Sequence, residues 1–141
     1  MSKTAATVNE AMTASPRAVQ GNTSVVEAAQ LMASEDVGSL PVVEGSRLVG
    51  IVTDRDLVLH VLAERRDPES VTVSEVCSSN PVVAHPDESL DEALKRMAKE
   101  QVRRLPVVDG ADLVGILAQA DVARTAEAES TGTLVEEISK D

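Results

Sequence analysis

Residues 38–56 read GSLPVVEGSRLVGIVTDRD, and residues 103–121 read RRLPVVDGADLVGILAQAD. The two stretches lie 65 positions apart, as the offset from Leu40 to Leu105 shows. The same offset of 65 positions continues on both sides of these stretches without a gap. Residues 7–58 overlay residues 72–123 with roughly twenty identities in about fifty pairs, and similarity at a fixed spacing is typical of a repeat architecture. The sequence therefore predicts two copies of one structural unit.

Each copy predicts the order strand, helix, strand, strand, helix. Ser24-x-x-Glu27 in the first copy is a capping pattern, and apolar residues follow it at helical spacing. Two short apolar runs split by Glu44-Gly45-Ser46 then predict a hairpin, whose second run carries Gly50. Since glycine in a strand often marks the close approach of another segment, we expect a neighbour there and at the matching Gly115.

Further features surround this order of elements. Thr7-x-x-Glu10 and its counterpart Thr72-x-x-Glu75 predict a helical turn ahead of each first strand. The proline of each Leu-Pro-Val-Val run suits a strand start or an edge, because proline has no N–H to donate. After Thr53, the spacing of apolar side chains predicts a last helix with one apolar face. That face comprises Leu57, Val58, Val61 and Leu62.

The domain organisation follows from the repeats. A repeat of this length is marginal for an independent core, so we expect the two repeats to share one core. The predicted fold class is α/β (α+β), with the repeats packed about an approximate two-fold axis. The predicted divisions are repeat 1 at 7–64, a linker at 65–71, repeat 2 at 72–124 and an acidic tail at 125–141. Within the tail, Thr133-x-x-Glu136 is compatible with one short helix, although a partly ordered terminus is the alternative.

Composition excludes several classes of function. The formal net charge of −11 opposes binding to nucleic-acid phosphates, and the absence of Phe, Tyr and Trp removes the aromatic platforms on which bases stack. No apolar run is long enough to span a bilayer, and no apolar signal stretch begins the chain, so we expect a cytoplasmic protein with no membrane contact. A single cysteine, Cys77, excludes an internal disulfide and a multi-thiolate zinc site.

The strongest candidate for binding chemistry is Gly50-x-x-Thr53-x-x-Asp56, where a strand leads into a helix. The first turn of a helix has free N–H groups that favour an anion such as phosphate. The Thr53 hydroxyl can join them, and the Asp56 carboxylate can accept hydrogen bonds from sugar hydroxyls. The alternative is that Thr53 and Asp56 form a helix cap and nothing more.

The duplicated unit, the Leu-Pro-Val-Val run and the Gly-x-x-Thr-x-x-Asp ending resemble a pair of cystathionine-β-synthase (CBS) domains, a regulatory module often called a Bateman module. The resemblance covers residues 7 to about 124. It implies two β-α-β-β-α repeats and a ligand containing adenosine, such as AMP, ADP, ATP or S-adenosylmethionine, in the cleft between them. It further implies that Thr53 contacts phosphate or ribose and that Asp56 contacts the ribose hydroxyls.

The second repeat departs from this pattern in two ways. Ala118 stands where the threonine is expected, so Asp121 can hold a ribose without help from a hydroxyl, and one competent cleft is the expectation. Arg103-Arg104 matches Gly38-Ser39 of the first repeat, and in the family such basic residues often reach ligand phosphates. Guanidinium groups suit a phosphate clamp. The alternative is that both arginines form ion pairs with surface carboxylates such as Glu100 or Asp112.

The resemblance also assigns the remaining ligand contacts. The small pair Gly38-Ser39 leaves room for the ligand, and the base is expected against the backbone around Ala18, Val19 and Val37. The ligand-binding set is Thr53, Asp56, Asp121, Arg103, Arg104, Gly38, Ser39, Ala18, Val19 and Val37.

Catalysis and metal binding find little support. His60 and His85 have no sequence pattern that ties them to Cys77, and Asp54, Asp56 and Asp121 are not at metal-ligand spacing. We therefore expect neither catalytic nor metal-ligating residues, and any magnesium would arrive with the phosphates of a nucleotide.

The resemblance favours a non-enzymatic, energy-sensing regulatory protein. It would bind the adenosine ligand, form a homodimer through its helical faces and signal to an unknown effector protein in trans. The alternative is an interaction or stress-response protein that keeps the fold and binds no nucleotide. Small stand-alone CBS-pair proteins with a Val-Arg-Arg-x-Pro-Val segment, present here from Val102, make that alternative plausible.

Overall fold

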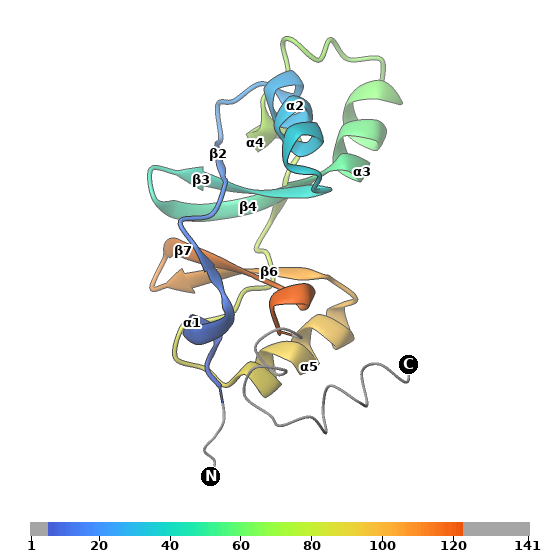
Figure 1. Ribbon diagram of the computed structural model, residues 1–141. Helices are drawn as coiled ribbons and strands as arrows, with labels where there is room; N and C mark the ends of the chain where they lie inside the picture. The colour runs from blue at the N-terminus through green and yellow to red at the C-terminus, as the bar shows by residue number, and fades with distance from the viewer. Residues whose placement is uncertain (1–5, 123–141) are drawn as a thin grey trace. The chain divides into compact units, whose positions relative to one another are not determined.

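The computed structural model describes residues 6–122 (Figure 1), and contacts divide the chain into two compact units. The repeat-1 unit comprises Arg17–Pro81 with Ala111–Leu113. Among the described residues, the repeat-2 unit comprises 6–16, Val82–Gly110 and 114–122. The acidic tail, with the helix expected from Thr133-x-x-Glu136, lies outside the described residues. Among those that are described, no helix is long and apolar enough to cross a membrane.

The repeat-1 unit has a small sheet with helices on one side of the β3–β4 hairpin (Figure 1). Strand β2 runs parallel to β3, β3 is antiparallel to β4, and β5 is antiparallel to β4. The elements are β2 (Val19–Gln20), α2 (Val25–Glu35), β3 (Ser39–Glu44), β4 (Arg47–Thr53), α3 (Asp54–Leu57), the π-helical turn η1 (Val58–Leu62), α4 (Val73–Val76) and β5 (Ser78–Ser79). The predicted order of strand, helix, strand, strand and helix is confirmed.

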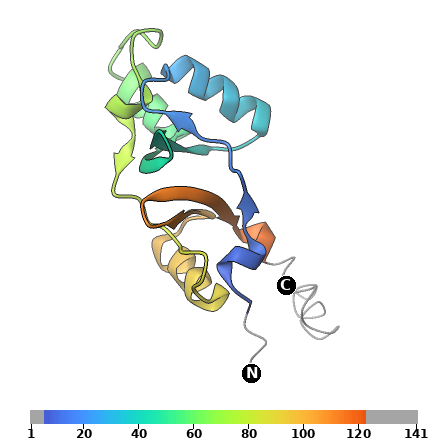
Figure 2. The ribbon, with the colours of Figure 1, turned by 90° about the vertical axis from the view of Figure 1, so that its left-hand side faces the viewer.

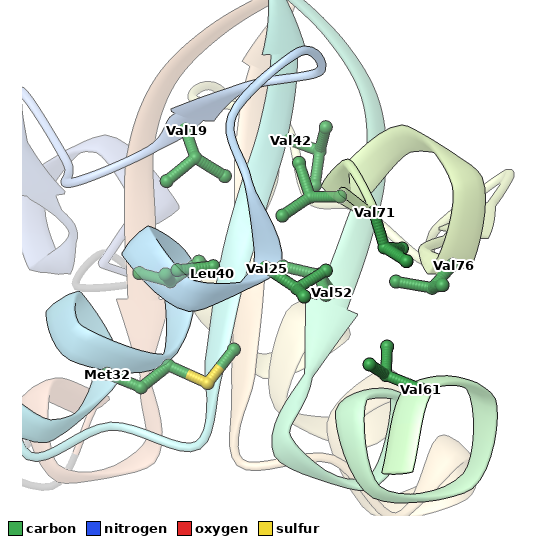
Figure 3. Close-up of a cluster of buried hydrophobic side chains, with 11 residues drawn as sticks. Val19, Val25, Met32, Leu40, Val42, Val52, Val61, Val71 and Val76 are labelled. Atoms are coloured by element: carbon green, nitrogen blue, oxygen red, sulfur yellow. The ribbon is translucent and has the colours of Figure 1, made fainter. Parts of the chain in front are cut away.

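Local signals in the sequence account for these boundaries. Helix α2 begins after Ser24, whose Oγ accepts a hydrogen bond from the Glu27 N–H at 3.2 Å. Gly45 adopts φ +65° in the turn between β3 and β4, a conformation that glycine takes at no steric cost. Apolar side chains from the strands and from α2, η1 and α4 then converge on one core (Figure 3). The buried residues that Figure 3 labels are Val19, Val25, Met32, Leu40, Val42, Val52, Val61, Val71 and Val76.

The repeat-2 unit has the same plan. Strand β1 pairs antiparallel with β7, β6 pairs with β7, and Ala84 forms a parallel bridge with Val107. Helix α5 lies against one face of the β6–β7 pair (Figure 2). The elements are α1 (Val8–Ala11), β1 (Thr13–Ala14), α5 (Leu90–Glu100), β6 (Arg104–Asp109) and β7 (Asp112–Ala118), and residues 119–122 are helical. The expected mixed α/β class is confirmed in both units.

The opening turn of each repeat packs with the other repeat. Val8 and Ala11 of α1 belong to the core that contains Met97 and Leu117, and the Val8 N–H donates to the Glu88 carbonyl at 3.0 Å. In the same way, Val73 of α4 is buried in the repeat-1 core, and its N–H donates to the Thr23 carbonyl at 2.9 Å. The sequence repeats and the packed units therefore do not coincide. The prediction of one core shared by both repeats is wrong, because the buried residues form two clusters, one in each unit, and the opening turn of the other repeat adds to each of them.

The two strand glycines mark close approaches, as predicted. A Cβ at Gly50 would lie 2.5 Å from the Ser78 carbonyl oxygen and 2.9 Å from the Cys77 Sγ. A Cβ at Gly115 would lie 3.0 Å from the Thr13 carbonyl oxygen and would also meet Met12. The neighbours are thus β5 and β1, which follow α4 and α1 along the chain. Because α4 and α1 are the opening turns that pack with the other repeat, we call them the exchanged turns.

The last helix of repeat 1 differs from expectation, whereas Pro41 occupies the edge position that was one of the two predicted for it. Within the last helix of repeat 1, Val61 is buried and Leu57 partly buried, whereas Val58 and Leu62 remain 51% and 65% exposed. A π-helical turn bonds residues five apart, and it therefore rotates side chains away from the face that α-helical spacing predicts. Pro41 lies inside β3 rather than at its start, opposite Ile51 of β4. Because β2 pairs with β3 only from Val42 onward, Pro41 does not need to donate to β2.

Candidate functional site

The turn from β4 into α3 is a complete helix cap. The Thr53 N–H donates to the Asp56 carboxylate at 2.9 Å, and the Asp56 N–H donates to the Thr53 Oγ1 at 3.1 Å. Both side chains are partly buried. The capping arrangement considered from the sequence is therefore present. It leaves the second carboxylate oxygen of Asp56 outside the bond to Thr53.

This turn suits a hydroxyl donor better than a phosphate. Of the first-turn N–H groups, that of Asp54 donates to the Gly38 carbonyl at 2.9 Å and that of Asp56 to the Thr53 hydroxyl. Two donors that could bind an anion are thus already used. The negative charges of Asp54 and Asp56 in this turn also oppose an anion. An acceptor-rich turn of this kind favours the vicinal hydroxyls of a sugar.

The structure brings the segment Val37–Ser39 beside this turn. Ser39 is the cross-strand neighbour of Thr53, and the Gly38 carbonyl accepts the Asp54 N–H. A Cβ at Gly38 would lie 3.1 Å from a carboxylate oxygen of Asp54, so a side chain there would crowd the turn. Five of the ten residues of the predicted ligand-binding set therefore gather in one place: Val37, Gly38, Ser39, Thr53 and Asp56.

Ala18 and Val19 lie further along the same sheet. Val19 of β2 pairs with Val42 of β3, so β3 separates it from the Thr53 turn on β4. The Val19 side chain is buried in the core, and Ala18 is half-buried just before the strand. Because the Val19 side chain is buried, only its backbone remains for the contact that the resemblance implies.

Asp121, the counterpart of Asp56, has different surroundings. Its side chain is only 8% exposed, and its carboxylate accepts a hydrogen bond from the Thr13 Oγ1 at 3.4 Å. Ala118 provides no hydroxyl at the position that corresponds to Thr53. Asp121 is thus less accessible to a ligand than Asp56.

Arg103 and Arg104 are exposed on the repeat-2 unit. Arg104 begins β6, and the Arg103 carbonyl accepts the Gln119 N–H at 2.9 Å, which places the pair beside the helical turn that contains Asp121. Neither arginine forms an ion pair with any residue in the described range 6–122. Partners at Glu100 or Asp112, the alternative considered from the sequence, are not found within that range.

Cys77 is a neighbour of the site that the motif did not identify. Burial raises the pKa of the Cys77 thiol, and the nearby charge of Asp56 raises this pKa further. Cys77 directly precedes β5, the strand that approaches Gly50. The strand glycine was the only sequence signal for this neighbour, and it did not specify which segment would approach.

The histidines have ordinary structural surroundings. His60 is exposed, with its Nδ1 at 3.8 Å from a carboxylate oxygen of Glu64. The His85 Nδ1 lies 3.2 Å from the Val108 carbonyl oxygen. Among residues 6–122, no group of three or more His, Cys, Asp or Glu side chains could hold a metal ion.

Comparisons with known proteins agree with this arrangement. The family model described as "CBS domain" matches residues 8–63 and again residues 73–127. The CBS domain-containing protein YhcV of Bacillus subtilis is 43% identical over 133 residues, which cover 94% of each chain. The AMP complex of CBSX2 is 32% identical with a TM-score of 0.74, covering 85% of this chain and 95% of that one.

A third relative is a mycobacterial protein. Hypoxic response protein 1 of Mycobacterium tuberculosis is 37% identical over 119 residues, which cover 84% of this chain and 83% of that protein. A solved structure of Hypoxic Response Protein I matches with a TM-score of 0.77 and contains two coordinated zinc ions. The described part of this chain has no cluster that fits such an ion. With two matches that span most of its length, the chain belongs to the CBS domain family and carries a tandem pair of CBS domains.

Proposed function

We propose that this protein is a regulatory module that binds an adenosine-containing ligand of the AMP type and signals that state to a partner protein in trans. The observation that carries the proposal is the gathering of Val37–Ser39 against the Thr53–Asp56 turn. An AMP complex of a relative with the same fold supports the class of ligand.

The sugar is assigned to the Thr53–Asp56 turn. Asp56 is only partly buried and keeps one carboxylate oxygen outside its bond to Thr53, so it can accept a ribose hydroxyl. Gly38 and Ser39 add little side-chain bulk at this point, which leaves room for the nucleoside. The base would lie against aliphatic residues and the backbone near Ala18, Val19 and Val37, since the chain has no aromatic residue.

The phosphate is assigned to Arg103 and Arg104. Guanidinium groups bind phosphate oxygens in pairs of hydrogen bonds, and these two are exposed and without described ion-pair partners. They belong to the repeat-2 unit, so their role is a separate part of the proposal. A regulatory ligand shifts the equilibrium between two arrangements of a protein by its difference in affinity for them. No catalytic role is proposed for any residue.

Calorimetric titration with AMP, ADP, ATP and S-adenosylmethionine tests this function. We expect saturable binding of at least one of them. Asp56→Ala should weaken it by about tenfold to a hundredfold, because hydrogen bonds to a charged acceptor are lost. Glu75→Ala is the matched control, since Glu75 also accepts the N–H of its helix-capping threonine, Thr72, at 2.9 Å. No binding of any of the four ligands, or equal losses in both variants, would contradict the proposal.

A further inference from the structure

The two repeats differ at a groove beside the first long helix. In the repeat-1 unit, a groove of about 630 Å³ lies between the β2 segment and the outer side of α2. This volume is within the range of small-molecule sites. The residues that matter here are Ala18, Thr23, Glu27, Gln30, Leu31 and Ser34. We call this space the α2 groove.

In the repeat-2 unit, a guanidinium group binds residues that correspond to two residues of this groove. At the offset of 65 residues, Arg96 matches Leu31, Glu88 matches Thr23 and Val83 matches Ala18. Arg96 donates to the Val83 carbonyl at 3.0 Å and to both carboxylate oxygens of Glu88 at 2.8 Å. The second repeat thus shows which chemical group the surroundings of this groove accommodate.

The first repeat lacks the cations of this region and also lacks the carboxylate that binds Arg96, because Thr23 stands in place of Glu88. Lys95, Arg96 and Lys99 of α5 are replaced by the neutral residues Gln30, Leu31 and Ser34 of α2. The carboxylate of Glu92 is kept as Glu27. Glu92 has Lys95 at 3.9 Å, whereas Glu27 has no ion-pair partner within residues 6–122.

The backbone acceptor is also kept. The Ala18 carbonyl, which corresponds to the carbonyl that Arg96 binds, accepts no hydrogen bond from the described part of the chain. The groove therefore offers a carbonyl oxygen, an unpaired carboxylate and the apolar side chain of Leu31. The net charge of −11 adds a long-range attraction for cations.

We propose that the α2 groove binds a guanidinium group supplied from outside the repeat-1 unit. The guanidinium donates to the Ala18 carbonyl and to the Glu27 carboxylate, and its alkyl stem packs on Leu31. A planar guanidinium suits this pair of acceptors better than an ammonium group, because its N–H donors point in fixed directions within one plane. Ala18 belongs to both proposals, since its backbone is also expected near the base of the nucleotide. Glu27, Leu31 and Thr23 have no part in the proposed nucleotide site, so variants at these three residues test the guanidinium proposal by itself.

An amide-detected NMR titration tests the proposal. N-acetyl-arginine amide should cause saturable shifts at the amides of residues 18–34. N-acetyl-citrulline amide, its neutral isostere, should bind about tenfold more weakly, because the charge of the donor is lost. A Gly-Arg-Gly peptide distinguishes the sources. Tighter binding of the peptide indicates an arginine of a partner chain, and equal affinity indicates that the guanidinium alone suffices. Shifts centred elsewhere, or equal affinity for arginine and citrulline amides, would overturn the proposal.

Variants based on the other repeat make the test specific. Glu27→Gln should weaken arginine-amide binding by about tenfold, whereas the matched Glu92→Gln should leave it unchanged. The double variant Thr23→Glu with Leu31→Arg transplants the occupied arrangement and should abolish binding. Undiminished binding in this folded double variant would contradict the proposed groove. If thermal melting shows that the double variant is unfolded, the comparison of Glu27→Gln with Glu92→Gln decides. Asp56→Ala should not affect arginine-amide binding.

Discussion

Thr53 and Asp56 hold each other through reciprocal hydrogen bonds of 2.9 and 3.1 Å. The same two side chains are the ones that the CBS resemblance assigns to the ligand. A structural role and a binding role are compatible here, because the cap fixes the positions of the hydroxyl and carboxylate before any ligand arrives. Stability and affinity therefore report two different roles of the same pair.

The first prediction concerns the cap. Thr53→Ala should lower the free energy of unfolding by about 1 kcal/mol, because α3 loses its N-cap hydroxyl. Ala118→Thr should raise it by a similar or smaller amount, since the helical turn at 119–122 gains a hydroxyl that Asp121 N–H can reach. Urea unfolding measures both changes. An unchanged stability in Thr53→Ala would show that the cap contributes little to the fold.

Gly50 provides a test of the exchanged turns. Gly50→Ala should cost about 1–3 kcal/mol, because its Cβ would meet the Ser78 carbonyl, which is backbone and cannot rotate away. Gly38→Ala is the control, since its Cβ would meet the end of the Asp54 side chain at 3.1 Å, and that side chain can move. Thermal melting of both variants compares them. Equal melting temperatures would argue against the close packing of β5 on β4.

Most of the fold could be predicted from the sequence. The capping threonines and serines, the hairpin glycines and the apolar spacing are local signals, and they placed the opening turn, the long helix and the hairpin of each repeat correctly. The first strand of repeat 2 is present only as a bridge between Ala84 and Val107. The exchange of the opening turns could not be predicted. The capping pattern at Thr7 and at Thr72 predicts a helical turn, but it does not indicate which repeat that turn packs against. The C-terminal ends of α2 and α5 could not be predicted either. Their C-cap residues, Asp36 and Gln101, adopt the left-handed conformation in which glycine is usually found.

Part of the candidate site was also predictable. The motif identified Thr53 and Asp56, and strand pairing then brought Val37–Ser39 beside them. Cys77 was missed, because it reaches this region only through the exchanged turn. The π-helical turn at η1 was likewise unpredictable, since the apolar spacing there fits an ordinary helix. It left Val58 and Leu62 exposed.

The pair Glu88–Arg96 predicts a dependence on pH. The hydrogen bonds from Arg96 hold the pKa of Glu88 below its ordinary value of 4.5. A lowered carboxyl pKa contributes stability above the ordinary pKa, and that contribution is lost as the pH falls through the folded-state pKa. Glu88→Gln should therefore be less stable than wild type at neutral pH, by about 1–3 kcal/mol. The difference should shrink from about pH 5 downward.

Urea unfolding at several pH values checks this expectation. Glu92→Gln serves as the control, because Glu92 is exposed and its pairing with Lys95 at 3.9 Å should contribute little at any pH. A stability difference between Glu88→Gln and wild type that persists unchanged at acid pH would rule out the ion pair as its cause.

The exposed apolar residues of η1 predict self-association. We propose that Val58 and Leu62, which are 51% and 65% exposed, become buried in a homodimer. Such burial contributes about 1–2 kcal/mol for each side chain. Light scattering should give wild type a mass near twice the 14.8 kDa of one chain. Val58→Glu with Leu62→Glu should give a folded monomer, and a wild-type monomer at high concentration would contradict the proposal.

The central claim is that an adenosine-containing ligand binds at the Thr53–Asp56 turn, and amide-detected NMR with AMP tests it most directly. We predict saturable shifts of the amides of Val37–Ser39 and of Thr53–Asp56, with further shifts at Arg103 and Arg104. In Asp56→Ala the same shifts should require a higher AMP concentration. The absence of saturable shifts, or shifts confined to residues elsewhere, would contradict the account.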